Sequence, residues 1–188
     1  MKIGTLCFRT DQGLSILAKS FFDHGIVTHP IAVRHGRRPE NVGWYPGCFE
    51  ITNLRDARQI SVVKEFIREM DAMLFFETPF IWELFPFCRE VGVKTFLEIM
   101  YECMPEVLPA QPDFFLCPSL LDQQCFPDRS MFLPLPVDVP WKLRKAASAF
   151  VHNAGWGGLL NRNGTGQLLD AMRLVKSPIK LILRSQKP

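Results

Sequence analysis

Short apolar runs alternate with segments of helical periodicity along most of the chain. The run from Lys2 to Phe8 is almost continuously apolar, as expected of a strand that is covered on both faces of a sheet. The next segment predicts a helix, because its apolar residues recur at helical spacing at Leu14, Leu17, Ala18 and Phe21. Gly25 is expected to end this helix.

The same alternation continues toward the C-terminus. Further strands are predicted at Ile26–Arg34, Cys48–Thr52, Asp71–Glu77, Val93–Met100, Pro112–Ser119 and Ser130–Asp138. Helical segments separate most of these strands, which favours an α/β fold with one parallel sheet and right-handed crossovers. The proline-rich stretch from Met104 to Pro112 is expected to lack regular structure.

Particular residues predict where several helices begin. A helix with an apolar stripe is predicted from Asp56. Ser119 is placed to cap a helix after the strand that it ends. Thr78 and Pro79 are predicted to be the N-cap and the first residue of another helix. Pro86 is expected to kink or split that helix.

The last quarter of the chain predicts one strand–helix–strand unit. A strand over Ala149–Asn153 precedes a glycine-rich loop and a helix, and a second strand covers Ile179–Ser185. Backbone N–H groups of such a loop can approach a phosphate, and we expect this role for Gly155, Gly157, Arg162, Gly164 and Thr165. The alternative is a connection without a ligand.

Composition and charge exclude few functions. The chain has 188 residues, of which 47% are hydrophobic and 22% are charged, and its formal net charge is +3. These values are typical of a globular protein, and the charge alone does not indicate binding to nucleic acid or membrane. Four neighbouring residues, Arg34, His35, Arg37 and Arg38, form a basic cluster that either meets phosphate or is a solvated loop.

The cysteines bear on the compartment and on metal binding. The six cysteines show no CxxC spacing and several lie in apolar runs, which indicates reduced core thiols and a cytoplasmic protein. The histidines are too scattered to predict a metal site. Charged or polar residues interrupt every apolar run, so no membrane span is predicted.

Several motifs in order give the chain a family resemblance. They are the glycine-rich stretch from Asn153 to Thr165, Leu168–Ala171, Asp113 with Ser119, and the Val137–Asp138 pair. In this order they resemble GT-B glycosyltransferases of the family-4 type. The resemblance implies a Rossmann-like N-terminal domain over 1–138, a linker over 139–148, and the truncated start of a second Rossmann-like, nucleotide-sugar-binding domain over 149–188.

The resemblance also implies roles for particular residues. The loop with Arg162 would grip the diphosphate of a nucleotide-sugar donor, and no metal or other cofactor is expected. Gln12 and Gly13 would remain of the glycine-rich loop that follows the first strand in the family. Glu77 and Glu98 end two strands, where a carboxylate can orient sugar hydroxyls or act as a base. The alternative for each acid is a cap or an ion pair.

The activity implied by the resemblance is transfer of a sugar, with retention of its anomeric configuration, from a nucleotide-diphosphate sugar to an unknown acceptor. The chain ends after the first unit of the second domain, so we expect self-association or a partner chain that completes it. Two alternatives stay open, a non-catalytic Rossmann-like scaffold and a doubly wound nucleotide-binding protein unrelated to sugar transfer.

Overall fold

The computed structural model describes residues 1–77, 79–100, 104–126, 128–136, 149–153, 164–176 and 178–184. The chain divides into two compact units, Met1–Asp138 and Val139–Pro188. Each unit is considered by itself.

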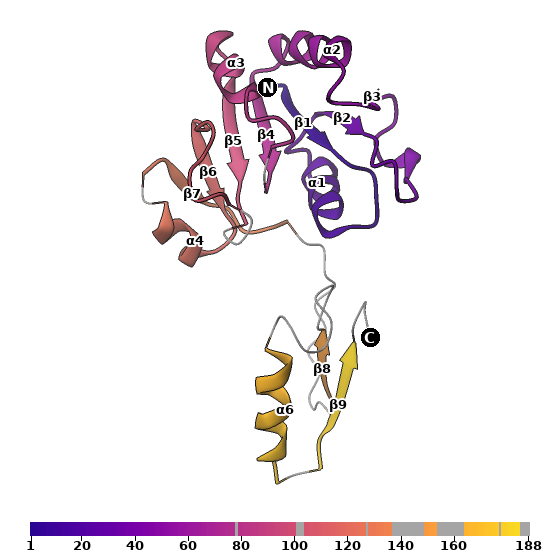
Figure 1. The fold of residues 1–188 in the computed structure, drawn as a ribbon, viewed down its shortest axis with the longest axis vertical. Coiled ribbons are helices and arrows are strands. Elements are labelled where there is room, and N and C mark those ends of the chain that lie inside the picture. The colour runs from indigo at the N-terminus through magenta and orange to yellow at the C-terminus, as the bar shows by residue number, and fades with distance from the viewer. Residues whose placement is uncertain are drawn as a thin grey trace. The chain divides into compact units, whose positions relative to one another are not determined.

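Seven parallel strands form the sheet of the first unit (Figure 1). They are β1 (Ile3–Cys7), β2 (His29–Val33), β3 (Phe49–Ile51), β4 (Ala72–Phe76), β5 (Lys94–Glu98), β6 (Phe114–Cys117) and β7 (Ser130–Phe132). Their order across the sheet is β3-β2-β1-β4-β5-β6-β7. This architecture confirms the predicted Rossmann-like parallel sheet flanked by helices.

Along the sequence, each helix of this unit lies between two consecutive strands (Figure 1). They are α1 (Gly13–Asp23), the 3-10 helix η1 (Val42–Trp44), α2 (Ala57–Arg68), α3 (Leu84–Glu90) and α4 (Leu120–Cys125). The predicted cap Ser119 is confirmed, because its hydroxyl accepts a hydrogen bond from the Asp122 N–H at 3.1 Å. The helix predicted from Asp56 is also found, and the Asp56 side chain caps it by accepting a hydrogen bond from the Arg58 N–H at 2.9 Å.

Both faces of the sheet are buried, and β4 shows how. Met73 and Phe75 point into a core shared with α2 and α3, whereas Leu74 and Phe76 point into a core shared with α1. All five residues of β4 are buried. Alternate side chains of a strand point to opposite faces, so a strand that is covered on both sides is apolar throughout.

The prediction of a helix that starts at Pro79 was wrong. The helix α3 begins at Leu84, and Pro86 therefore lies in its first turn, where the missing N–H has no helical partner to lose. The preceding stretch stays irregular because its aromatic residues pack into the core, with the Trp82 ring 5.7 Å from that of Phe85. The predicted kink is consequently absent from α3.

The last predicted strand of this unit is shorter than expected. It was predicted to run to Asp138, but β7 ends at Phe132. Pro134 and Pro136 follow within four residues and cannot donate hydrogen bonds to a neighbouring strand.

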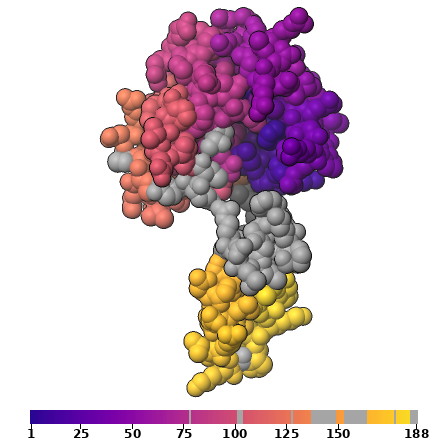
Figure 2. All heavy atoms as spheres, viewed as in Figure 1, coloured from indigo at the N-terminus to yellow at the C-terminus, as the bar shows by residue number. Residues whose placement is uncertain are grey.

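The direction of chain progression reverses between β1 and β4. From β1 the chain moves outward through β2 to β3, and it then returns to β4 and moves the other way to β7. In the space-filling view, indigo and purple residues accordingly form one flank of this unit and orange residues near β7 the other (Figure 2). The carboxyl ends of β1 and β4 thus flank a topological switch point, where open parallel sheets bind ligands.

The second unit contains the predicted strand–helix–strand arrangement. The strands β8 (Ala149–Asn153) and β9 (Lys180–Arg184) pair in parallel, and α6 (Thr165–Arg173) lies between them in sequence. Phe150 and Val151 remain 57% and 58% exposed. Self-association through this unit stays a prediction.

One face of the sheet is tightly packed around Gly4 in β1. A Cβ atom at this position would lie 2.6 Å from Sδ of Met73 and 2.8 Å from a ring carbon of Phe66. We expect Gly4→Val to lower the free energy of unfolding by about 1–3 kcal/mol, because the core must shift to admit the side chain. Urea denaturation measures the change.

The matched control for that variant is Gly43→Ala, since a Cβ atom at Gly43 meets no atom within 4 Å. Equal stability of Gly4→Val and the unchanged protein would contradict the packing described for this face.

Candidate functional site

The carboxyl ends of β1, β4 and β5 lie side by side in the sheet. Glu98 is the last residue of β5, Glu77 directly follows β4, and the loop after β1 leads to Gln12 and Gly13 at the start of α1. The structure therefore places four residues singled out from the sequence at one edge of the sheet. Their predicted roles in acceptor binding and catalysis stay predictions.

Glu98 is a buried carboxyl group at this edge. Its side chain is 1% exposed, and its Oε2 atom has no hydrogen-bond partner among the described residues. Burial, with a further contribution from the nearby Glu77 carboxylate, raises the pKa of Glu98 to about 7. A carboxyl group with this pKa can both hold and accept a proton near neutral pH, as an acid–base catalyst must.

Glu77 adopts an uncommon backbone conformation beside Glu98. Its φ angle is 57°, in the left-handed region that side chains other than glycine rarely occupy. The Glu77 N–H donates to the Glu98 carbonyl oxygen at 2.7 Å, which continues the β4–β5 pairing and holds the turn. Strained residues that their surroundings hold in place cluster at functional sites, so this conformation supports the edge as a candidate site.

Aromatic rings connect the loops on either side of the switch point. Phe8, which follows β1, lies 4.8 Å from the ring of Phe80 and 5.0 Å from that of His35. Both contacts are edge-on, the favoured arrangement of aromatic pairs. Phe8 thus joins the segments that follow β1, β2 and β4.

A buried arginine lies beside these rings, and the sequence-based predictions did not single it out. Arg9 is 6% exposed, and its Nη2 atom donates to Glu40 at 2.7 Å and also to Glu50. Burial opposes the charge of Arg9, but the two carboxylates outweigh this and raise its pKa. Burial alone would raise the pKa of Glu40, whereas Arg9 and the His35 N–H lower it.

Arg9 could have been noticed from its position. A charged residue directly after an apolar strand of a parallel sheet lies at the edge where ligands bind. The residues that pair with it are 31 and 41 positions away, and no local pattern predicts those contacts.

The predicted donor loop is described only at its end. Gly155, Gly157 and Arg162 lie outside the described residues. Gly164 is the N-cap of α6 with a φ of 68°, and the Thr165 side chain is 2% exposed. The Thr165 hydroxyl is 2.8 Å from Nε2 of His152.

Two residues of the resemblance have structural roles. The Asp113 carboxylate accepts hydrogen bonds from the N–H and the hydroxyl of Thr95, both at 2.9 Å, which joins the start of β6 to β5. Burial raises the pKa of Asp113, but these hydrogen bonds outweigh it, and the pKa is lowered. Ser119 caps α4, as shown above. Either motif residue is thus explained by folding alone.

The structure also bears on the cysteines, on metal binding and on membrane spans. Cys7, Cys88 and Cys117 are buried free thiols, but Cys125 is exposed, which corrects its assignment to the core. Within the described part of the chain, no group of three or more histidine, cysteine, aspartate or glutamate residues could hold a metal ion. None of the described helices is both long and apolar enough to cross a bilayer.

Comparison with protein-family models, curated proteins and solved structures found no match to this chain. The resemblance to family-4 glycosyltransferases therefore depends on the sequence motifs.

Substitution of Glu98 tests its protonation. A carboxyl group with a raised pKa stabilises the fold fully below its unfolded pKa of about 4.3, and this contribution is lost as the pH rises through about 7. We expect Glu98→Gln to match the unchanged protein at low pH and to be more stable at pH 8 by about 4 kcal/mol at most.

Denaturation at several pH values measures this difference. The control is Glu90→Gln, since Glu90 is an exposed residue of α3. A stability gain that does not change with pH would contradict a buried, protonated Glu98.

Proposed function

We propose that this chain is the acceptor-side domain of a GT-B type glycosyltransferase together with the first unit of its donor domain. The observation that carries the proposal is the pair of carboxyl groups, Glu77 and Glu98, at the ends of adjacent strands beside the switch point. The order of a Rossmann-like domain followed by a separate strand–helix–strand unit supports it.

In this proposal, the first unit holds the acceptor at the carboxyl edge of its sheet. Glu98, once ionised, takes a proton from the attacking hydroxyl group of the acceptor. Alternatively, Glu98 and Glu77 together help to orient that hydroxyl group. The donor is a nucleotide-diphosphate sugar, and the glycine-rich loop with Arg162 neutralises the departing diphosphate. Most of the catalysis would come from positioning the two substrates, and the protein would act in the cytoplasm.

The second candidate is a non-catalytic Rossmann-like binding protein. The observation that favours it is the 1% exposure of Glu98, because a carboxyl group that meets no solvent needs a local movement before it can meet a substrate. If Glu98 has only a structural role, the protein would bind a ligand at this edge of the sheet without catalysing sugar transfer.

Transfer and hydrolysis assays with a panel of UDP-, GDP- and TDP-sugars separate these candidates. We expect the unchanged chain to consume at least one donor, and Glu98→Gln to reduce the rate about 100-fold or more, the typical contribution of a general base. Glu90→Gln is the control and should retain the rate. If no donor is consumed, the binding protein becomes the better proposal.

Donor binding is tested at Arg162, which was predicted from the sequence alone. We expect Arg162→Ala to weaken binding of a nucleotide diphosphate about ten- to a hundredfold, because a charge-assisted contact of roughly 1.5–3 kcal/mol is lost. Arg162→Lys should recover part of it, since the charge returns without the planar fork.

Calorimetry measures this binding, and Arg144→Ala in the predicted linker is the control. Equal affinity of Arg162→Ala and the unchanged chain would remove Arg162 from the donor site.

A further inference from the structure

A cavity of about 380 Å³ lies beside Arg9, at the carboxyl ends of β1 and β2. Every second residue from Arg34 to Val42 lines it, together with Arg9 and Glu50; the full set is Arg9, Arg34, Gly36, Arg38, Glu40, Val42 and Glu50. Gly36 has a φ of 73°, a turn that glycine makes without strain. The cavity has the size of a small-ligand site, for which about 300–1,000 Å³ is typical.

The carboxylates of this cavity are already engaged. Glu40 accepts hydrogen bonds from the His35 N–H at 3.0 Å and from Arg9 at 2.7 Å. Glu50 accepts one from Arg9 and lies 3.5 Å from Nε of Arg34. Each of the four carboxylate oxygens therefore faces a donor of the protein, and little acceptor capacity is left for a ligand.

The guanidinium groups, in contrast, keep donors in reserve. Arg34 is 57% exposed and Arg38 is also exposed, and a guanidinium carries five N–H donors. Nε of Arg9 is buried and has no partner among the described residues. The three arginines and two glutamates that line the cavity leave one net positive charge. Such a cavity is built to accept an anion.

The arginines are held in place by the neighbouring elements. With the oxygen and nitrogen of its side-chain amide exchanged, Gln12 accepts hydrogen bonds from Nε of Arg38 at 2.6 Å and from its Nη1 and Nη2 at 3.1 and 3.0 Å, which leaves the other two N–H donors of this guanidinium for a ligand. The Asn41 N–H donates to the Arg9 carbonyl oxygen at 2.7 Å, and its side chain donates to Asp11, also at 2.7 Å. These contacts connect the loop after β2 to the loop after β1. Preorganised donors lose less conformational entropy on binding than a mobile loop would.

We propose that this cavity binds the phosphate group of a small phosphorylated molecule. Arg34 and Arg38 provide guanidinium forks that fit phosphate oxygens, and the ion-paired Arg9 lines the cavity beside them. The volume leaves room for more than the phosphate, so a phosphate ester fits the cavity better than the free anion. Binding at this site does not require the nucleotide-sugar donor of the reaction proposed above.

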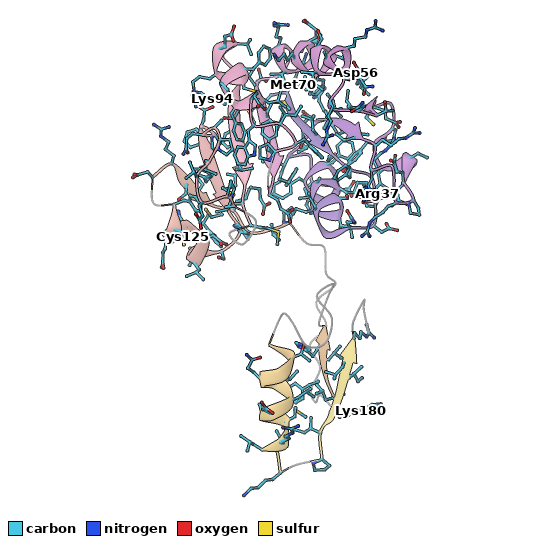
Figure 3. The ribbon with its side chains drawn as sticks, in the orientation of Figure 1. Arg37, Asp56, Met70, Lys94, Cys125 and Lys180 are labelled. Carbon is cyan, nitrogen blue, oxygen red and sulfur yellow. The ribbon has the colours of Figure 1, made fainter. Side chains whose placement is uncertain are left out.

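The basic cluster also supplies a matched control. Arg37 belongs to the same loop and is exposed, but it does not line the cavity. Figure 3 shows Arg37 at the outer edge of the first unit. If the loop attracted anions only through its charge in solvent, Arg37 would contribute as much to binding as Arg34 and Arg38. In a formed binding site, Arg37 would contribute less than these two residues.

The test is calorimetry of the whole chain at fixed ionic strength, with inorganic phosphate and with a hexose monophosphate. We expect Arg34→Ala and Arg38→Ala each to weaken binding of both probes about tenfold or more, and Arg37→Ala to change it less than about twofold. The hexose monophosphate should bind more tightly than inorganic phosphate. Circular dichroism confirms that each variant is folded. Arg9 is left unchanged, because its removal would leave the mostly buried Glu40 carboxylate without its charged partner.

Three results would overturn the proposal. They are no binding of either probe by the unchanged chain, an equal loss for Arg37→Ala, and binding of inorganic phosphate without binding of the ester. The measurements need no nucleotide-sugar donor. A chain that binds the ester but transfers no sugar therefore contradicts the proposed function and leaves this site intact.

Discussion

Burial of both faces of the parallel sheet is the constraint on which the rest of the first unit depends. When helices cover both faces, the middle of each strand has no room for unpaired polar groups. The polar residue Thr5 in β1 shows this, because its buried hydroxyl donates to the Leu74 carbonyl oxygen at 2.6 Å. Apart from Glu50 in the edge strand β3, the charged residues of this sheet therefore lie at or just beyond the strand ends, as Arg9, Glu77 and Glu98 do.

At that edge, the carboxyl groups differ in protonation because they differ in surroundings. Glu40 pairs with Arg9, and its pKa is lowered despite its burial. Glu98 is buried beside another acid, and its pKa is raised to about 7. Carboxyl groups whose pKa values are shifted in opposite directions by their surroundings are common at functional sites. The edge therefore has two parts, one that is ion-paired around Arg9 and one that can exchange a proton at Glu98.

Much of the fold could be predicted from the sequence because it follows from local patterns. The apolar runs predicted β1 and β4, the helix predicted from Asp56 is α2, and Ser119 caps α4 as expected. The start of α3 could not be predicted in this way. There the packing of aromatic residues such as Trp82 into the core outweighs the preference of Pro79 for a first helical turn.

The candidate site shows the same division. Glu77 and Glu98 could be found because each follows an apolar strand, and the sheet order brings them together. The burial of Glu98 and the pairing of Arg9 with Glu40 and Glu50 depend on contacts between distant segments. Such contacts leave no periodic trace in a single sequence.

The most direct test of this account is the protonation of one carboxyl group. Carbon NMR of protein labelled at the glutamate side-chain carboxyl carbons, with the Glu98 signal assigned by its loss in Glu98→Gln, follows that group as the pH changes. The account predicts a midpoint near pH 7, as burial beside Glu77 requires. A midpoint near 4.3, the ordinary pKa of glutamate, would show a solvated side chain and contradict the account.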